Sequence, residues 1–282
     1  MYQAGLVLEG GGMKGVYTCG VLDFFLDKGL EFSSCYGVSA AACSLCSFLS
    51  KQRGRAFHTN IDYAGDKNYC SLYSLLTTGD LFNVDMCYYQ IPDKLNPYDH
   101  ETFEKYQGNF YSVVTNIETG EPEYIPIKDL HVDIEAIRAS ASLPLVSRNV
   151  PFGGKLYLDG GISDGIPLAR SMQEGNCKNV VVMTKEVGYR RKPTSALSLI
   201  KMRYRKYPKV YELMRDRHLV YNATLDLIEE QVKEGTTFLI QPKKKSEVGR
   251  IEKDVDKLKA LYEEGYQDTE NCYEELLVFL NS

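Results

Sequence analysis

Hydrophobic positions in the first fifty residues form short unbroken runs that alternate with helical stripes. An unbroken run over 4–9 predicts a buried strand, and a stripe over 16–30 predicts a helix that ends at Gly29. A second strand over 34–38 and a second, almost wholly apolar helix over 40–49 follow. This strand–helix–strand–helix order predicts an α/β fold with a parallel sheet covered by helices.

The remainder of the chain adds elements with less regular spacing. Residues 52–100 are mixed and rich in predicted loops, with many tyrosines. A helix is predicted over 133–141, and regular helical stripes return after residue 217. The further predicted strands are 110–116, 123–127, 155–158, 180–184 and 237–241. We therefore expect a mainly parallel central sheet that is followed by a mainly helical C-terminal extension.

The composition is that of an ordinary globular protein. The chain has 282 residues, of which 44% are hydrophobic and 25% charged, enough for one large domain or one domain with an appendage. The net charge of -5 disfavours nucleic acid as a partner. Because we find no signal peptide and no apolar run of the roughly 18 residues that a membrane span needs, we expect a cytoplasmic protein.

The cysteine pattern predicts neither a metal site nor a disulfide framework. Eight cysteines occur, mostly within apolar stretches, so reduced and buried thiols are expected. Cys43 and Cys46 have the spacing of half a redox or zinc site, but no second pair and no paired histidine accompany them. We expect no metal and no organic cofactor.

A glycine cluster follows the first predicted strand and opens the first predicted helix. Such a strand–loop–helix unit exposes backbone N–H groups, which can hold a phosphate or an oxyanion that forms during a reaction. The residues of this loop are Gly10, Gly11, Gly12, Met13, Lys14 and Gly15.

The same loop matches the dinucleotide fingerprint G-x-G-x-x-G at Gly10, Gly12 and Gly15. That site also needs an acidic residue about 20 positions further on, at the end of the second strand. Glu31 precedes that strand, which ends at Ser39 without an acid. No Gly-Lys-Ser/Thr closes the loop either, so a nucleotide-dependent oxidoreductase is disfavoured.

The second strand instead runs into a sequence that differs from the nucleophile elbow G-x-S-x-G by one methyl group. A capping serine at an ordinary strand-to-helix turn would look the same. However, the carboxyl ends of neighbouring parallel strands lie at one edge of a sheet, so the glycine loop is expected beside this serine. The loop then becomes an oxyanion hole with N–H groups of Gly11 and Gly12 near Ser39 Oγ. The elbow residues are Gly37, Val38, Ser39, Ala40 and Ala41.

A serine nucleophile needs a base, and the four histidines are poor candidates. His218 follows Asp159 in the Ser–Asp–His order of α/β-hydrolases, but it lies in a basic helical stretch that is typical of a protein surface. Asp159 ends a predicted strand and precedes Gly160 and Gly161, so its carboxylate can point into a cleft. An ordinary turn aspartate is the alternative for Asp159, and Asp164 is the rival carboxylate.

These three motifs, in this order, resemble the patatin-like phospholipase family over residues 4–185. The glycine block resembles that family's G-G-G-x-[RK]-G loop, with Lys14 at the basic position. The serine block resembles its G-x-S-x-G elbow, from which Ala41 departs, and the aspartate block resembles its D-G-[GA]. The segment 139–144, Ala-Ser-Ala-Ser-Leu-Pro, resembles the one that precedes the family's catalytic aspartate strand.

The resemblance implies a three-layer α/β/α fold and a metal-independent lipid acyl hydrolase of the phospholipase A or esterase type. It implies that Ser39 attacks the ester carbonyl and that Asp159 takes the serine proton, without a histidine. Lys14 would be a supporting charge beside the oxyanion hole. The alternative is a non-catalytic lipid- or anion-binding protein on the same fold.

Composition shifts near residue 188, which predicts a catalytic domain at 1–187 and a mainly helical extension at 188–282 packed on it. Residues 189–217 hold ten Lys or Arg against Glu212 and Asp216. This basic arm is either a solvated helical arm or a peripheral contact for anionic lipid headgroups. Lipid or another ester is the expected substrate partner, and the sequence says nothing of the oligomeric state.

Overall fold

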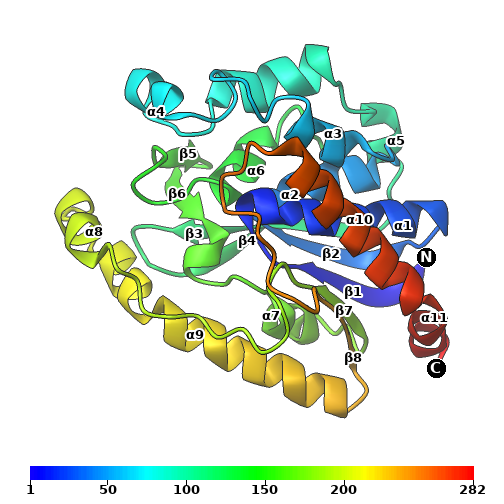
Figure 1. The fold of residues 1–282 in the computed structure, drawn as a ribbon. Coiled ribbons are helices and arrows are strands. Elements are labelled where there is room, and N and C mark those ends of the chain that lie inside the picture. Colours follow the sequence, from blue (N-terminus) through cyan, green and yellow to red (C-terminus); the bar gives the residue numbers. More distant parts are fainter.

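The computed structural model describes residues 1–282 and contains one eight-stranded sheet (Figure 1). Its strands are arranged in the order β5-β6-β3-β2-β1-β7-β8, and β4 pairs with β3. The stretch from β3 to β8 is parallel, whereas β4, β5 and β6 pair antiparallel. The strands are β1 (Tyr2–Leu8), β2 (Phe32–Val38), β3 (Asn109–Asn116), β4 (Pro122–Pro126), β5 (Val150–Phe152), β6 (Lys155–Asp159), β7 (Asn179–Val182) and β8 (Thr237–Ile240).

Helices cover both faces of this sheet, and none of them is long and apolar enough to cross a membrane. A π-helix occupies Met86–Leu95, and short 3-10 turns occupy Gly12–Gly15 and Gly160–Ile162. The α-helices are α1 (Val16–Asp27), α2 (Ala40–Leu49), α3 (Arg55–Ile61), α4 (Leu72–Thr78), α5 (His100–Glu104), α6 (Ile134–Ser140), α7 (Leu168–Gln173), α8 (Leu197–Arg203), α9 (Pro208–Lys233), α10 (Val255–Asn271) and α11 (Tyr273–Asn281).

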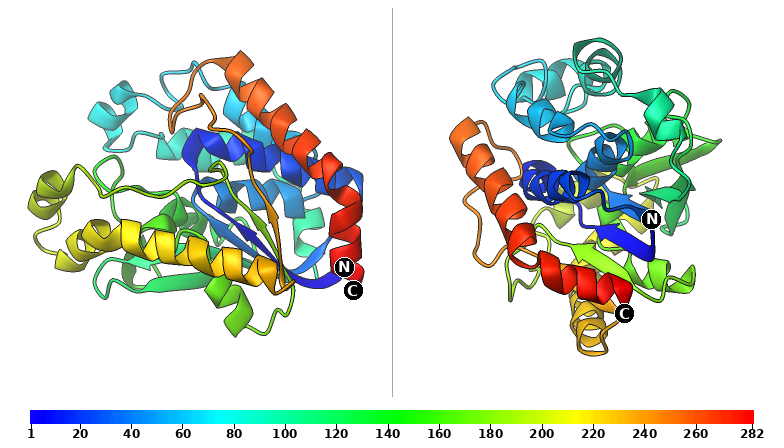
Figure 2. Two further views of the ribbon diagram at one scale, coloured as in Figure 1. Left: turned by 60° about the horizontal axis from the view of Figure 1, so that its bottom comes forward. Right: turned by 90° about the vertical axis from the view of Figure 1, so that its right-hand side faces the viewer.

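The alternation of side chains along the central strands divides the core into two layers. Leu6 and Leu8 of β1 face the larger core, which α1, α2 and α10 complete. Val7 faces the other side and packs with Tyr36 and with residues of α7 and α9. The two helical layers enclose the sheet from opposite sides (Figure 2), which confirms the predicted α/β fold of three layers with a mainly parallel sheet.

Residues beyond 188 pack closely on the first part of the chain. Strand β8 extends the sheet in parallel beside β7, and α10 crosses α1 at very short range. A Cβ atom placed on Gly265 would lie 2.1 Å from the carbonyl oxygen of Tyr17, so only glycine allows this approach. The division of the chain at residue 188 stays a prediction.

The segment 52–100 is more ordered than its mixed pattern suggests. It forms α3, α4 and the π-helix, and this part of the chain lies at the top of the molecule in the view of Figure 1. Helices α3 and α4 have seven residues each, too few for an amphipathic stripe to recur. Arg55, which begins α3, is buried and holds its guanidinium over the Tyr98 ring, so charge and aromatic contacts stabilise this segment.

Candidate active site

The register of β3 brings the ends of two strands together. Residues Tyr111–Thr115 pair with β4 along one edge of β3, so β2 and β6 share the other edge. Strand β2 runs parallel to β3 and ends with Val38 opposite Val113. Strand β6 runs antiparallel and ends with Asp159 opposite Val114. The two strands therefore meet head to head, and Ser39 and Asp159 border the same cavity.

Ser39 occupies a strained turn between β2 and α2. Its φ of 57° and ψ of -126° lie in a region that residues other than glycine rarely adopt. The Ser39 N–H donates to Ser140 Oγ at 2.8 Å, and Ser140 Oγ donates to the Val113 carbonyl at 2.6 Å. This chain of hydrogen bonds from β3 through α6 holds the turn in place.

Small neighbours make the turn possible, as the sequence pattern suggests. A Cβ on Gly37 would lie 2.7 Å from Ala42 Cα, so no side chain fits there. Ala41 is buried in the first turn of α2 with a negative φ, where an alanine needs no strained backbone. The methyl group that separates Ala41 from the G-x-S-x-G pattern is therefore accommodated.

The glycine loop lies directly against Ser39. Leu8 of β1 pairs with Gly37 of β2, and a Cβ on Gly10 would lie 2.9 Å from Ser39 Cβ. The N–H groups of Gly10, Gly11 and Gly12 donate to no acceptor in the protein.

The other residues of the loop form backbone hydrogen bonds or pack closely against α2. Met13 N–H donates to the Arg250 carbonyl at 3.1 Å, and Lys14 N–H donates to the Gly11 carbonyl at 3.3 Å. A Cβ on Gly15 would lie 3.2 Å from Ala40 Cβ, so Gly15 serves close packing. The Lys14 side chain borders neither of the two cavities described below. The free N–H groups of the loop are thus those of its three leading glycines.

Asp159 is buried at the end of β6, with 1% of its surface exposed. Its Oδ1 accepts the Gly161 N–H at 2.7 Å, and its own N–H donates to the Ser142 carbonyl at 2.8 Å. Oδ2 has no hydrogen-bond partner. Burial raises the pKa of Asp159, against the opposing effects of the nearby Ser39 side chain and of Arg217. The carboxylate is thus a stronger base than an exposed aspartate.

The glycines after Asp159 allow this close arrangement. A Cβ on Gly160 would lie 2.1 Å from the Val113 carbonyl oxygen. A Cβ on Gly161 would lie 3.0 Å from Asp159 Oδ1 and 3.1 Å from Arg217 Nη2. Both positions therefore exclude larger side chains beside the carboxylate.

The rival bases lie elsewhere. Asp164 Oδ2 accepts the Tyr124 hydroxyl at 2.7 Å, and the residue borders neither cavity at Ser39. His218 Nδ1 lies 3.1 Å from the Arg215 carbonyl, and none of the four histidines lines these cavities. Of the two candidate carboxyl groups, Asp159 and Asp164, only Asp159 borders a cavity together with Ser39.

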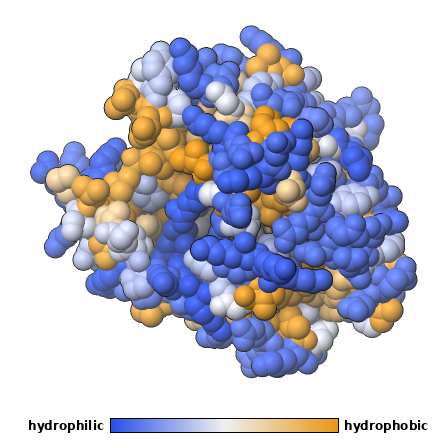
Figure 3. All heavy atoms as spheres, viewed as in Figure 1, coloured by the Kyte–Doolittle hydropathy of each residue, from blue (hydrophilic) through white to orange (hydrophobic).

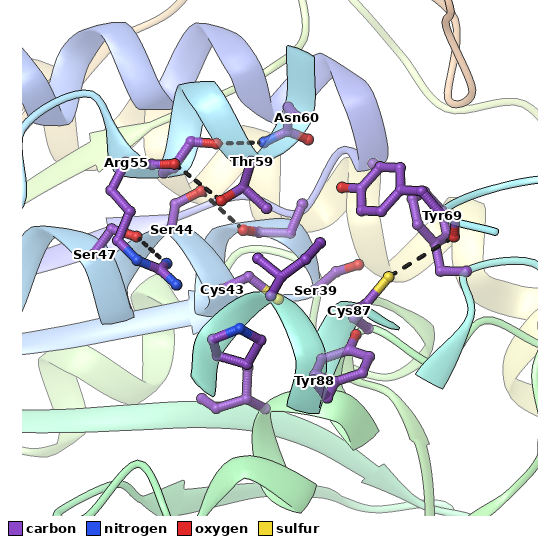
Figure 4. A pocket seen from close by; sticks show the side chains of 18 of the residues that line it. Ser39, Cys43, Ser44, Ser47, Arg55, Thr59, Asn60, Tyr69, Cys87 and Tyr88 are labelled. Carbon is purple, nitrogen blue, oxygen red and sulfur yellow. Dashed lines mark hydrogen bonds between the residues drawn. The ribbon is translucent and has the colours of Figure 1, made fainter. Parts of the chain in front are cut away.

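Two cavities of opposite character meet at Ser39 and share Gly12, Ser39 and Leu143. The first, which we call the apolar cavity, offers water-sized groups about 130 Å³ and is lined mainly by hydrophobic side chains (Figure 4). One face of α2 lines its length, through Ala40, Cys43, Ser44 and Ser47.

The second, which we call the basic cavity, offers about 40 Å³ and contains Asp159 and the glycine loop. Four cations also line it. Their positions place them in the loop after β7, in α9 and in the loop between β8 and α10. They are Lys185, Arg191, Arg217 and Arg250.

Sequence reasoning overlooked several residues that shape this site. Ser140 and Ser142 lie in the segment 139–144, whose resemblance to the family was the signal that could have found them. Arg191 and Arg217 belong to the basic arm but point inward, which charge counting along the chain does not reveal. Glu9, buried below the glycine loop, accepts the Tyr221 hydroxyl at 2.5 Å.

The structure thus places the serine turn, the buried aspartate and the glycine loop, which carry the sequence resemblance to the patatin-like phospholipase family, around one site. The family model described as patatin-like phospholipase matches residues 6–170, and the chain belongs to this family. A second model, of a domain of unknown function (DUF6363), matches residues 207–281.

Two curated proteins are similar to this chain. The uncharacterised protein YjjU of Escherichia coli (strain K12) is 31% identical over 185 residues, which are 64% of this chain and 51% of YjjU. The protein named Probable lipid hydrolase 463L, of Invertebrate iridescent virus 6, is 26% identical over 195 residues, 63% of this chain and 66% of that protein. The aligned part thus spans about half to two thirds of each relative. The family whose model matches is described as patatin-like phospholipase, and one of the two relatives is named as a probable lipid hydrolase.

Among solved structures, the crystal structure of VipD from Legionella pneumophila is similar to this chain, and the match covers 100% of this chain and 67% of the VipD chain. The TM-score is 0.47 and the sequence identity 11%.

The strain at Ser39 predicts that removing its Cβ stabilises the fold. Relief of a positive φ is worth about 1–3 kcal/mol, and the extra unfolded-state freedom of glycine costs about 0.5–1 kcal/mol. We expect Ser39→Gly to unfold at a higher urea concentration than Ser39→Ala, by about 1 kcal/mol in free energy of unfolding. Both variants lack the hydroxyl, so the comparison isolates the backbone. An equal or lower midpoint for Ser39→Gly would show that the turn is unstrained.

Proposed function

We propose that this protein cleaves carboxylic ester bonds of lipids through a dyad of Ser39 and Asp159, with the glycine loop as oxyanion hole. The observation that carries the proposal is the head-to-head meeting of β2 and β6, which sets a strained serine beside a buried carboxylate. The glycine loop against Ser39 supports the same proposal, because the N–H groups of its three leading glycines are free to donate to an oxyanion.

In the first half of the reaction, Ser39 Oγ attacks the carbonyl carbon of the ester while Asp159 accepts the hydroxyl proton. The carbonyl oxygen becomes an oxyanion that the glycine N–H groups stabilise. When the tetrahedral intermediate collapses, the bond to the alcohol breaks, and Asp159 returns the proton to the leaving alkoxide. An acyl ester on Ser39 remains.

In the second half, water attacks the acyl carbon and gives a proton to Asp159. Collapse of this second intermediate releases the fatty acid, and the proton returns to Ser39 Oγ. Burial suits Asp159 to this task, because a raised pKa makes the carboxylate a better proton acceptor. The free Oδ2 is the oxygen available to take the proton, since Oδ1 accepts from Gly161.

The apolar cavity would hold the acyl chain. The face of α2 from Ala40 to Ser47 extends about 10 Å at a helical rise of about 1.5 Å per residue. Hydrophobic side chains such as Tyr88, Ile91 and Ile137 complete the wall. The length and the mainly hydrophobic lining of this cavity suit an acyl chain.

The dyad predicts that Ser39→Ala and Asp159→Asn each reduce kcat/KM for ester hydrolysis by about 10³-fold or more. The first variant loses the nucleophile, and the second loses the base while keeping the shape of the side chain. Hydrolysis of a short-chain p-nitrophenyl ester measures both, and a fluorophosphonate probe reports whether Ser39 is reactive.

Asp164→Asn is the matched control, because this second, half-buried carboxyl borders neither cavity. It should retain activity. Full activity of either dyad variant contradicts the mechanism, and folded protein that the probe does not label favours the non-catalytic binding protein instead.

The raised pKa of Asp159 predicts the acid side of the pH profile. The mechanism needs the ionised carboxylate, which is lost as the pH falls through the folded-state pKa. Since burial raises that pKa, the acid limb of kcat/KM should lie above the ordinary aspartate value of 3.8. Initial rates across pH, with circular dichroism to verify the fold, test this. A limb at or below 3.8 is inconsistent with Asp159 as the base.

We also propose that α4 and α8 contact the membrane that carries the substrate. Hydrophobic side chains gather over both helices on the face in Figure 3, with Leu76 of α4 86% and Met202 of α8 70% exposed. Leu75 of α4 packs in the cluster of Tyr69, which lines the apolar cavity. Exposed cations without salt bridges adjoin α8, namely Lys201, Arg203, Arg205 and Lys206.

This contact predicts that the double change Leu76→Glu and Met202→Glu lowers binding to vesicles that contain anionic lipid by about tenfold. The loss follows because a carboxylate opposes both burial in lipid and attraction to a negative surface. Val278→Glu is the control, since Val278 of α11 is equally exposed outside these two helices. Vesicle co-sedimentation measures binding, and unchanged binding of the double variant refutes the surface.

A further inference from the structure

Helix α9 contacts two separate motifs of the candidate site. It covers the face of the sheet opposite α1 and α2 (Figure 1), and it lies at the start of the region 207–281 that matches a domain of unknown function. Arg217 and Tyr221 are four residues apart on one face of this helix, and both line the basic cavity beside Ser39. Each of them contacts a different motif of the first part of the chain.

Arg217 holds the turn that follows Asp159. Its Nε donates to the Gly161 carbonyl at 2.5 Å, and the Gly161 N–H donates to Asp159 Oδ1 at 2.7 Å. A single residue, Gly161, therefore connects the guanidinium with the carboxylate. The guanidinium also acts through its charge, because Arg217 lowers the pKa of Asp159 against the larger effect of burial.

Asp159 faces further titratable groups in the basic cavity and on α2. Arg250, in the loop between β8 and α10, also lowers the pKa of Asp159, but to a smaller extent than Arg217. Burial raises the pKa of the Cys43 thiol of α2 to about 11, so this group is uncharged at neutral pH. Arg217 is thus the cation with the largest effect on the carboxylate. The remaining groups of the cavity are Glu9, Lys185, Arg191 and Tyr221.

Tyr221 holds the base of the glycine loop. Its hydroxyl donates to Glu9 Oε1 at 2.5 Å, and Glu9 directly precedes Gly10. Glu9 Oε2 accepts the Thr184 N–H and hydroxyl at 2.7 and 2.9 Å. A Cβ on Gly11 would lie 2.7 Å from Thr184 Oγ1, so this cluster packs directly against the loop. Because Glu9 is buried, the loss of the Tyr221 hydroxyl leaves a carboxylate oxygen without a partner.

Neighbouring residues on other faces of α9 do not contact these motifs. Arg215 pairs with the adjacent Asp216, and His218 Nδ1 lies 3.1 Å from the Arg215 carbonyl. None of these three residues lines either cavity. The contacts with the site therefore come from one face of the helix.

We propose that α9 positions the reacting groups of the site, with Arg217 holding the turn that presents Asp159 and Tyr221 holding the glycine loop. This inference rests on the proposed hydrolase function. Both are positioning residues, because they act through Gly161 and Glu9 and do not touch the ester. The start of the region 207–281, whose matching model has no known function, thereby takes part in the geometry of the site.

The role of Arg217 predicts a shift in the pH profile. Arg217→Met should raise the acid limb of kcat/KM by about one pH unit, because the ionised form of Asp159 loses a neighbouring cation. Arg217→Lys keeps the charge, so its limb should stay in place while the plateau rate falls, since an ammonium does not reproduce the directed Nε–H donor. Initial rates on a short-chain p-nitrophenyl ester measure both. A purely structural role would lower the rate at every pH without moving the limb.

The role of Tyr221 predicts a loss that is specific to the oxyanion. Tyr221→Phe removes only the hydroxyl that Glu9 accepts, so kcat should fall at least tenfold with little change in KM. An alkyl trifluoromethyl ketone, which forms an oxyanion adduct with Ser39, should inhibit this variant at least tenfold more weakly. The corresponding alkyl alcohol forms no oxyanion, so its inhibition constant should not change. Thr184→Val removes another donor to Glu9 and should have the same effect, which provides a second variant if the first does not fold.

Arg215→Gln and Tyr211→Phe are the matched controls on the same helix. Arg215 pairs with Asp216 and Tyr211 lines neither cavity, so both variants should behave as the wild-type protein does. Circular dichroism verifies that each variant is folded, and Arg217→Gln replaces Arg217→Met if the latter is not.

Failure of this inference is distinguishable from failure of the proposed function. In an active wild-type background, an acid limb that stays in place without the Arg217 charge refutes the role of Arg217. Unchanged inhibition of Tyr221→Phe by the ketone refutes the role of Tyr221, and the hydrolase function stands in both cases. Wild-type protein that hydrolyses no ester refutes the hydrolase function, and this inference falls with it.

Discussion

The pairing of β3 is the constraint on which the site depends. One edge of this strand holds β2 up to Val113 and β6 from Val114 onward, so two strands of opposite direction end against each other. Since backbone hydrogen bonds fix the register, Ser39 and Asp159 are positioned by the sheet itself and not by flexible loops. The hydroxyl of Ser140 in α6 also accepts a hydrogen bond from the backbone N–H of Ser39. The strain at Ser39 persists because these surroundings determine it.

Charged and apolar side chains line separate cavities around Ser39. The face of α2 that begins at Ala40 borders an apolar cavity, whereas Asp159 lies in a cavity with four cations. A serine at the boundary of two such environments suits an amphiphilic molecule whose reacting bond lies where its apolar and polar halves join. The same arrangement raises the pKa of Asp159 by burial and moderates it through Arg217. The residues that set the pKa of Asp159 thus also line the cavity beside Ser39.

Sequence patterns predicted seven of the eight strands, the longer helices and the motifs at Gly10–Gly15, Ser39 and Asp159, because each depends on local spacing. Parallel order also predicted that the glycine loop and the serine turn lie at one sheet edge. Local spacing does not reveal which segments that are distant in the sequence contact one another. Arg191 and Arg217 look like members of a solvated arm in sequence, yet they line a cavity with Asp159. The short helices α3 and α4 and the three-residue strand β5 were likewise too brief to leave a periodic signal.

The Arg250 carbonyl that accepts the Met13 N–H links the last quarter of the chain to the loop beside the nucleophile. The residues of the proposed dyad and oxyanion hole lie within 10–161, whereas the cations of the basic cavity lie within 185–250. The sequences of these two parts of the chain can therefore change at different rates during evolution. Under the proposed mechanism, a substitution in the later segment changes the lining of the basic cavity and leaves Ser39, Asp159 and the glycine loop as they are.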